Sequence, residues 1–532
     1  MKLLVNEYSA LALRASNAMP LTTPTRPGRG DSLRSTATLS RANALSTRRL
    51  RVLLRLSRVA ALVATLLVVL VAPSSAVSSA QQCKSTSRLL RYVVLFDAGT
   101  SEQSAQQAVG SACGTSIAFY PQIAVGIAVS AEPRFAARFG LARAYSAQAE
   151  TVGNPAPAEL GSPAIPSTAA RLPAAEQQLV ADRSGQQWDM DMIHAPQARS
   201  INPGRREVLV GVLDSGVDAT HPDLAAAVDP TRSAGCLSGK PDQSPAAWSP
   251  NTSQHGTHVA GIIAAADDGH GITGVAPGVR LASVKVVDDD GFIYPEYAVC
   301  GFMWAAREHM RITNNSYSLD PWLLTCSNVP GQAVAYTAVQ RAVDYATAHG
   351  VLSIAAAGNE GINLANPHQD VRSPDNVPNP RRRPVDGHCS VLPAELPGVV
   401  AVSAVGARRI KSEYSSYGQG VITVTAPGGD RAQPSGPKGS GCVLSAIPGG
   451  YGYACGTSMA TPHVSGVAAL LASAQPKTGP RELASLLRQQ ADPLPCPTHQ
   501  DDPSAACTGD TDNEFYGAGL VNALRAVSVR QD

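Results

Sequence analysis

The fold is decided by the stretch Gly456-Thr457-Ser458-Met459-Ala460-Thr461-Pro462-His463-Val464, which continues directly into the apolar run 465–472. Apolar residues recur at helical spacing through this run, and Pro462 is tolerated in the first turn of a helix. The sequence therefore predicts a turn of small residues that leads into a helix with Ser458 at its mouth. A serine in this place is usually only an N-cap, so Ser458 alone does not indicate a reaction.

Two upstream stretches supply the groups that a reactive serine needs, because a serine hydroxyl is a poor nucleophile until a base removes its proton. The apolar run 207–213 predicts a strand buried on both faces, and it ends at Asp214. His255 opens a second helix of small residues. Aspartate, histidine and serine therefore each lie at the edge of a regular element, where an α/β sheet gathers reacting groups.

These three segments together resemble those of the subtilisin-like serine proteases, over about residues 186 to 528. The resemblance implies that Asp214 orients and stabilises the imidazole of His255, which acts first as general base and then as general acid. Ser458 is then the nucleophile. The neighbouring His258 is not the base by this match, and we expect it to be held by local hydrogen bonds.

A fourth stretch, 351–361, is an apolar strand that ends in Gly358-Asn359. An asparagine beside a glycine is ordinarily a turn residue. The same resemblance implies instead that Asn359 donates a hydrogen bond to the oxyanion that forms during the reaction.

The resemblance also assigns two walls between which an extended peptide would be held by strand addition. One wall is formed by Ser316, Tyr317 and Ser318, and the opposite wall by Ala356, Ala357 and Gly358. Ser318 stands where relatives often have glycine, which would narrow the pocket. The insertion 361–388, with Arg381-Arg382-Arg383, matches no segment of the family. It is either a contact for acidic substrates, a further processing site or a solvated loop.

Apolar runs that predict strands alternate with periodic segments that predict helices throughout this region. The predicted strands are 207–213, 281–287, 310–316, 351–357, 399–405 and 421–426, and the predicted helices are 255–266, 294–309, 331–349, 458–474 and 480–490. Such alternation predicts an α/β fold of three layers, with a mainly parallel sheet and helices on both faces.

Residues 1–80 predict an N-terminal extension followed by a secretory signal peptide. The uncharged run 59–72 follows several arginines and precedes small residues, and we expect cleavage after Ala76 or Ala80. The run is shorter than the roughly 20 residues of a spanning helix, so an uncleaved membrane anchor is the alternative. The first 50 residues are either a disordered extension or the result of a misassigned translation start. We expect a secreted, extracellular protein that binds no nucleic acid.

Short strands and helices between 84 and 145 indicate a small α+β unit. Its position and its Tyr92-Val93-Val94-Leu95-Phe96 segment resemble the inhibitory propeptides that precede many subtilisin-like proteases. The resemblance implies that this unit assists folding and blocks the cleft as an intramolecular inhibitor until it is cut. A structural or adhesion domain is the alternative. Residues 146–185 are rich in proline and alanine, which predicts a linker before the peptidase domain 186–528.

The number and spacing of the cysteines agree with secretion. An even number of scattered cysteines without a Cys-x-x-Cys pair favours disulfides over zinc, and disulfides persist in secreted proteins. Short loops suggest three pairs and leave a fourth by elimination: Cys300–Cys326, Cys442–Cys455, Cys496–Cys507 and Cys236–Cys389. Catalysis needs no cofactor, but structural calcium is a candidate. The resemblance implies that Asp223 matches a ligand of the family, and Asp268 lies in the polar loop 266–273, which has the length that binds calcium in many relatives; carboxylates suit this hard cation. A solvated loop without metal is the alternative.

The sequence thus predicts a secreted, monomeric serine endopeptidase that is made as a precursor and cuts protein or peptide substrates through an acyl-enzyme. One rival prediction is a catalytically silent subtilase fold that binds peptides. A second rival is a membrane-anchored processing protease with few substrates.

Overall fold

The computed structural model describes residues 83–86, 88–151, 170–171, 181–377, 381–436, 440–497 and 507–528. The predicted targeting segment 1–80 and most of the predicted linker 146–185 lie outside the described residues. Among the described helices, none combines the length and the hydropathy needed to cross a membrane.

The centre of the fold is a sheet of seven strands in the order β16-β15-β11-β9-β6-β8-β7, and every neighbouring pair is parallel. In chain order the strands are β6 (Leu209–Asp214), β7 (Ala234–Gly235), β8 (Arg280–Lys285), β9 (Ile312–Asn315), β11 (Leu352–Ala356), β15 (Val400–Val405) and β16 (Val424–Pro427). Strands β6, β11 and β15 are apolar along most of their length because both of their faces are buried, whereas the equally buried β9 has the sequence Ile-Thr-Asn-Asn.

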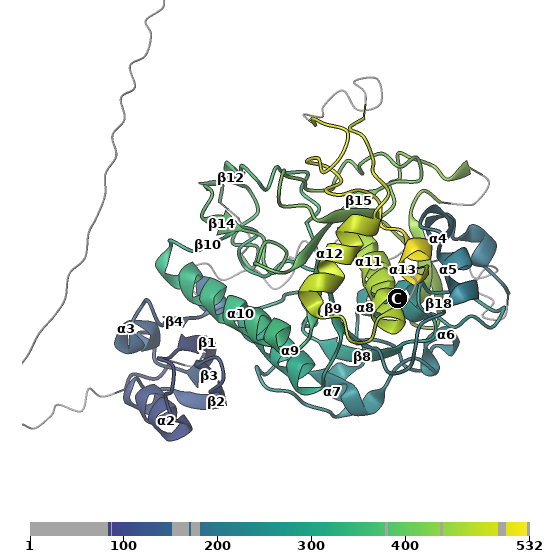
Figure 1. The fold of residues 1–532 in the computed structure, drawn as a ribbon. Coiled ribbons are helices and arrows are strands. Elements are labelled where there is room, and N and C mark those ends of the chain that lie inside the picture. The colour runs from purple at the N-terminus through teal and green to yellow at the C-terminus, as the bar shows by residue number, and fades with distance from the viewer. Residues whose placement is uncertain are drawn as a thin grey trace, which may run out of the picture. The chain divides into compact units, whose positions relative to one another are not determined.

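Helices cover both faces of this sheet (Figure 1). Successive side chains of β6 alternate between two hydrophobic clusters: Val210 and Val212 join one, and Leu209 and Leu213 join the other. The first cluster holds α4 (Trp188–Met192), α5 (Ala195–Ile201), α8 (His255–Ala264), α11 (Thr457–Ala474), α12 (Pro480–Gln490) and α13 (Ala523–Val527), and the second holds α9 (Pro295–Arg307) and α10 (Pro330–Ala348). The predicted three-layer α/β class is confirmed.

Smaller elements surround the three layers. They are α6 (Pro222–Ala225), α7 (Pro245–Trp248), the pair β10 (Thr325–Cys326) and β14 (Cys389–Ser390), the pair β12 (Gln369–Asp370) and β13 (Arg383–Pro384), and an antiparallel sheet of β17 (Val443–Ile447), β18 (Gly450–Ala454) and β5 (Ala170–Arg171). Hairpin β17–β18 leads directly into the turn before Ser458.

An N-terminal lobe, residues 84–151 apart from residue 87, forms an α+β unit of its own. Its antiparallel sheet has the order β2-β3-β1-β4, from β1 (Leu90–Leu95), β2 (Thr115–Tyr120), β3 (Val125–Ser130) and β4 (Ala144–Tyr145), with α2 (Glu102–Ser111) and α3 (Phe135–Phe139). Val93, Val125 and Ile127 of this sheet belong to the same hydrophobic cluster as α9 and α10. Arg341 Nη1 of α10 also donates to the carbonyl oxygens of Ile123 and Ala124, at 3.2 and 3.3 Å.

Five disulfides are present: Cys83–Cys113, Cys236–Cys300, Cys326–Cys389, Cys442–Cys455 and Cys496–Cys507. The structure contains the predicted bridges Cys442–Cys455 and Cys496–Cys507. The prediction Cys300–Cys326 was wrong because nearness in sequence does not decide this pair, and Cys236–Cys389, which was inferred by elimination, was wrong as a result. Cys326 and Cys389 are register partners in β10 and β14, and Cys300 lies within α9, where it meets Cys236 after β7.

Candidate active site

The sheet and a helix bring Asp214 and His255 together. Asp214 is the last residue of β6 and His255 the first of α8, and both side chains are about 1% exposed. The Nδ1 atom of His255 lies 2.7 and 2.9 Å from the two carboxylate oxygens of Asp214. A carboxylate only accepts hydrogen bonds, so Nδ1 must carry the proton in this contact. The Nε2 atom of His255 is then free to act as a base.

Gly256 allows this close contact. A Cβ atom at Gly256 would lie 2.3 Å from the carbonyl oxygen of Gly216 and 3.1 Å from Oδ1 of Asp214. Any side chain there would push the start of α8 away from the end of β6. The Nε2 atom of His255 is buried and has no hydrogen-bond partner among the described residues. Nδ1 of the imidazole is therefore held by Asp214, and Nε2 is left without a hydrogen-bond partner among the described residues.

Ser458 lies in the first turn of α11, at the same edge of the sheet. Its Oγ donates a hydrogen bond of 3.0 Å to the carbonyl oxygen of Ser316, which follows β9. Strands β6 and β9 are parallel neighbours, and Leu213 is the register partner of Asn315. Asp214 and Ser316, the residues that follow this pair, therefore lie at the same end of the two strands. Within the described part of the chain, no hydrogen bond joins Ser458 to His255. Such catalytic hydrogen bonds often form only when substrate is bound.

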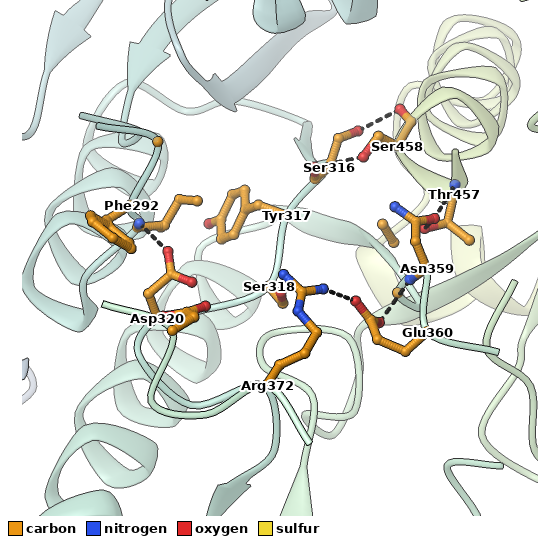
Figure 2. A pocket seen from close by; sticks show the side chains of 15 residues that line it. Phe292, Ser316, Tyr317, Ser318, Asp320, Asn359, Glu360, Arg372, Thr457 and Ser458 are labelled. Atoms are coloured by element: carbon orange, nitrogen blue, oxygen red, sulfur yellow. Dashed lines mark hydrogen bonds and ion pairs between the residues drawn. The ribbon is translucent and has the colours of Figure 1, made fainter. Parts of the chain in front are cut away.

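Asn359 follows β11 and faces the same turn (Figure 2). Its Oδ1 accepts hydrogen bonds of 2.9 Å from both the backbone N–H and the hydroxyl of Thr457, which leaves Nδ2 as a donor. A Cβ atom at Gly456 would lie 3.5 Å from Nδ2 of Asn359 and 3.6 Å from the backbone nitrogen of Ser458. Nδ2 of Asn359 and the backbone nitrogen of Ser458 therefore lie near the same point of this turn.

Both predicted substrate walls border a cavity of about 60 Å³ next to Ser458 (Figure 2). Of the predicted wall residues, Ser316, Tyr317, Ser318, Ala356 and Gly358 line the cavity, together with Asn359, Thr457 and Ser458. Ala357 does not line it, and its side chain is fully buried.

The cavity also has lining residues that the sequence analysis did not identify, namely Gly291, Phe292, Ile293, Asp320, Glu360, Arg372 and Asp375. Arg372 and Asp375 come from the insertion 361–388, and Arg372 forms an ion pair with Glu360. The absence of a family counterpart for this insertion was the one available signal. Of its three consecutive arginines, Arg383 is bound to Asp370 at 2.7 Å and the other two are exposed.

The other histidines near the site are held locally, as expected. Burial, followed by the neighbouring His255, lowers the pKa of His258 to about 3, and its Nε2 lies 3.1 Å from the carbonyl oxygen of Gly452. His258 is therefore neutral at ordinary pH. His463, within α11, is fully buried and lies 3.0 Å from Oδ2 of Asp189.

The two calcium candidates have different surroundings. The buried Asp223 accepts hydrogen bonds from the hydroxyl of Tyr451 at 3.0 Å and from the backbone of Ile272 at 2.9 Å. Burial raises its pKa, and the charge of the half-exposed Asp268 raises it further. A cation near both carboxylates would relieve this repulsion, so their chemistry fits calcium. Among the described residues, one cluster has side chains close enough together to hold a metal, namely Cys496, Cys507 and Glu514. Its two cysteines are joined in a disulfide.

Comparison with known proteins shows the family of this chain. The family model described as the subtilase family matches residues 205–519. Fervidolysin from Fervidobacterium pennivorans is 32% identical over 327 residues, which make up 58% of this chain and 40% of that protein. Subtilisin NAT from Bacillus subtilis subsp. natto is 31% identical over 344 residues, which make up 64% of this chain and 70% of that protein. The chain therefore belongs to the subtilase family.

The fold is also similar to that of a solved structure, the epidermin leader peptide processing serine protease from Staphylococcus aureus. The TM-score is 0.62 at 20% sequence identity, and the match covers 84% of this chain and 99% of that one. This likeness supports the subtilisin-like fold.

Proposed function

We propose that this chain is an endopeptidase that hydrolyses peptide bonds through an acyl-enzyme on Ser458. The observation that carries the proposal is the bond between His255 and Asp214, because it leaves Nε2 of His255 without a partner, and the helix α11 packed against α8 carries Ser458 in its first turn. A hydroxyl proton needs such an acceptor when the oxygen attacks a carbonyl carbon.

The residues of the site can be assigned to successive steps. A peptide lies between the two walls, and His255 Nε2 removes the proton of Ser458 as its Oγ attacks the carbonyl carbon. Asn359 Nδ2 and the backbone N–H of Ser458 then hydrogen-bond the oxyanion. His255 returns the proton to the leaving amine, and water hydrolyses the acyl-enzyme by the same steps. Asp214 holds the ring and stabilises its charged form.

A serine-directed fluorophosphonate tests this proposal directly. We expect a covalent adduct on Ser458, located by mass spectrometry, in protein secreted and freed of its N-terminal lobe. The variant Ser458→Ala should carry no adduct, because an unactivated serine does not react. Folded, lobe-free protein that forms no adduct would contradict the proposal and favour the silent peptide-binding fold.

We further propose that the N-terminal lobe is an inhibitory propeptide and that the chain is exported and processed by its own active site. The shared hydrophobic cluster of the lobe with α9 and α10 supports this role, since it holds the lobe on the peptidase domain. The labelling experiment also reports on processing. The Ser458→Ala protein should keep its lobe covalently attached, whereas the parent should lose it.

Structural calcium at Asp223 and Asp268 is a separate proposal that concerns stability alone. A bound ligand stabilises the folded state by mass action, by about 2.7 kcal/mol at one hundred times its Kd. We therefore expect a chelator to lower the melting temperature of the lobe-free protein by several degrees, and added calcium to restore it. Asp268→Asn should reduce this response. A melting temperature that the chelator leaves unchanged would contradict the proposal.

A further inference from the structure

Two carboxyl groups line the cavity beside Ser458 and have no part in the proposed reaction. Asp320 closely follows the wall Ser316–Ser318, and Asp375 comes from the insertion 361–388. Figure 2 shows Asp320 across the cavity from Ser458, with Tyr317 and Ser318 between them. A side chain that enters the cavity from a bound peptide would therefore meet these carboxyl groups.

Asp320 and Asp375 both line the cavity and lie close enough for each carboxyl group to affect the pKa of the other. Burial raises the pKa of both groups, and the charge of Asp375 raises that of Asp320 further. Asp320 Oδ2 accepts one more hydrogen bond, of 2.6 Å, from the backbone of Ile293. Asp375 Oδ1 is buried, and no N–H donor in the described part of the chain reaches it. The pair therefore has unused capacity to accept hydrogen bonds.

The remaining charges of the cavity do not balance this pair. Arg372 is the one basic residue among the lining residues; its charge favours the ionised form of Asp375, but its ion pair is with Glu360. No ion pair joins Asp320 or Asp375 to a basic side chain within the described ranges. Asp288, which accepts a hydrogen bond of 2.9 Å from the backbone of Phe292, adds negative charge next to Asp320. The unbalanced charge of the cavity is negative.

We propose that this cavity selects peptides with an arginine or lysine side chain on the acyl side of the scissile bond, held by Asp320 and Asp375. The proposal rests on the peptidase function proposed above. A bound cation favours the ionised form of both carboxyl groups, and any proton that they carry is released to solvent. A buried charge needs such a partner.

The rest of the lining suits the same side chains. Phe292, Ile293 and Tyr317 border the cavity and would cover the aliphatic stem of lysine or arginine. Two adjacent carboxyl groups can also accept several hydrogen bonds from one guanidinium. A glutamate or aspartate side chain is negatively charged and would instead be repelled by the negative charge of the cavity. The insertion 361–388 thus supplies part of the specificity, and for basic rather than acidic substrates.

A positional scan tests this inference on the parent protein. Quenched fluorescent peptides would carry arginine, lysine, norleucine or glutamate at each of the four positions before the scissile bond. At one position we expect kcat/KM for lysine to exceed that for norleucine, its neutral counterpart of similar shape, by at least about 30-fold. If norleucine or glutamate is cleaved as well as lysine and arginine at all four positions, the inference is wrong.

Variants then assign the preference to the carboxyl pair. Asp375→Asn should lower the lysine-to-norleucine ratio at least about tenfold, while the norleucine peptide is still cleaved. Asp386→Asn is the matched control, because Asp386 is an exposed acid of the same insertion that does not line the cavity. It should leave the ratio unchanged. A folded Asp375→Asn protein with the parental ratio would overturn the assignment. Asp320→Asn gives a second test, since asparagine can still accept from Ile293.

The two proposals fail in different ways. If the proposed function is wrong, no peptide is cleaved and fluorophosphonate labels nothing. If only the specificity is wrong, Ser458 is labelled and peptides are cleaved without preference for a basic side chain. Should Asp375→Asn fail to fold, as judged by its melting curve, the scan on the parent protein still decides.

Discussion

His255→Ala is expected to lower kcat on any cleaved peptide by about 10⁶, a loss of the size found when the corresponding base is removed from subtilisin. The imidazole is the one group in the described site that has both a fixing partner, Asp214, and an unoccupied nitrogen. Without it, the proton of Ser458 has no acceptor. Initial rates at saturating peptide concentration measure the effect.

Two comparisons make this result specific. His349→Ala removes an exposed histidine at the end of α10 and should leave kcat unchanged. Melting curves show whether His255→Ala is folded. A folded His255→Ala protein that keeps more than a few per cent of the parental kcat would mean that another group is the base. His258 is a poor replacement, because it is buried, is bound to the carbonyl of Gly452 and is a weak base whose pKa burial lowers to about 3.

Asn359→Ala should lower kcat by about 10²- to 10³-fold and change KM little, because its Nδ2 group stabilises a charge that exists only in the transition state. The substitution also removes the acceptor for Thr457, which could disturb the turn before Ser458. Asn359→Asp separates the two effects. Aspartate keeps an acceptor for Thr457 but has no N–H to donate.

We expect Asn359→Asp to be at least as impaired as Asn359→Ala, with a melting temperature close to that of the parent. If Asn359→Asp were as active as the parent, the side chain would only brace the turn, and the oxyanion would be stabilised elsewhere. Single-turnover rates of acylation measure the step in which the donor acts.

The sheet and its helices could be predicted closely because their signal is local. The predicted strand 351–357 is β11, Leu352–Ala356, and the predicted helix 480–490 has the bounds of α12. A strand buried on both faces is mostly apolar, as β11 is, so the pattern reveals it. The placement of Asp214, His255 and Ser458 at the ends of elements follows from the same local pattern.

Contacts between distant loops could not be predicted, because no local pattern encodes them. Cys326 pairs with Cys389 because β10 and β14 meet, and neither two-residue strand has a sequence signature. The nearness of Asp320 and Asp375 could not be predicted for the same reason, since one follows β9 and the other lies in the separate segment 361–388. Nor does the pattern show that Ser458 donates to Ser316 in this structure.

The hydrophobic cluster that the N-terminal lobe shares with α9 and α10 has a consequence for activation. Removing apolar surface from contact with water is favourable, by about 25 cal/mol per Å², so breaking the chain between the two parts would not by itself separate them. Before a cut, the covalent link keeps the lobe at a high effective concentration beside the peptidase domain. After a cut, the lobe would bind as a separate molecule. Occupancy of the peptidase domain would then depend on how much lobe remains in the surrounding volume. Dilution and digestion of the free lobe, rather than the cut, would set the time at which activity begins.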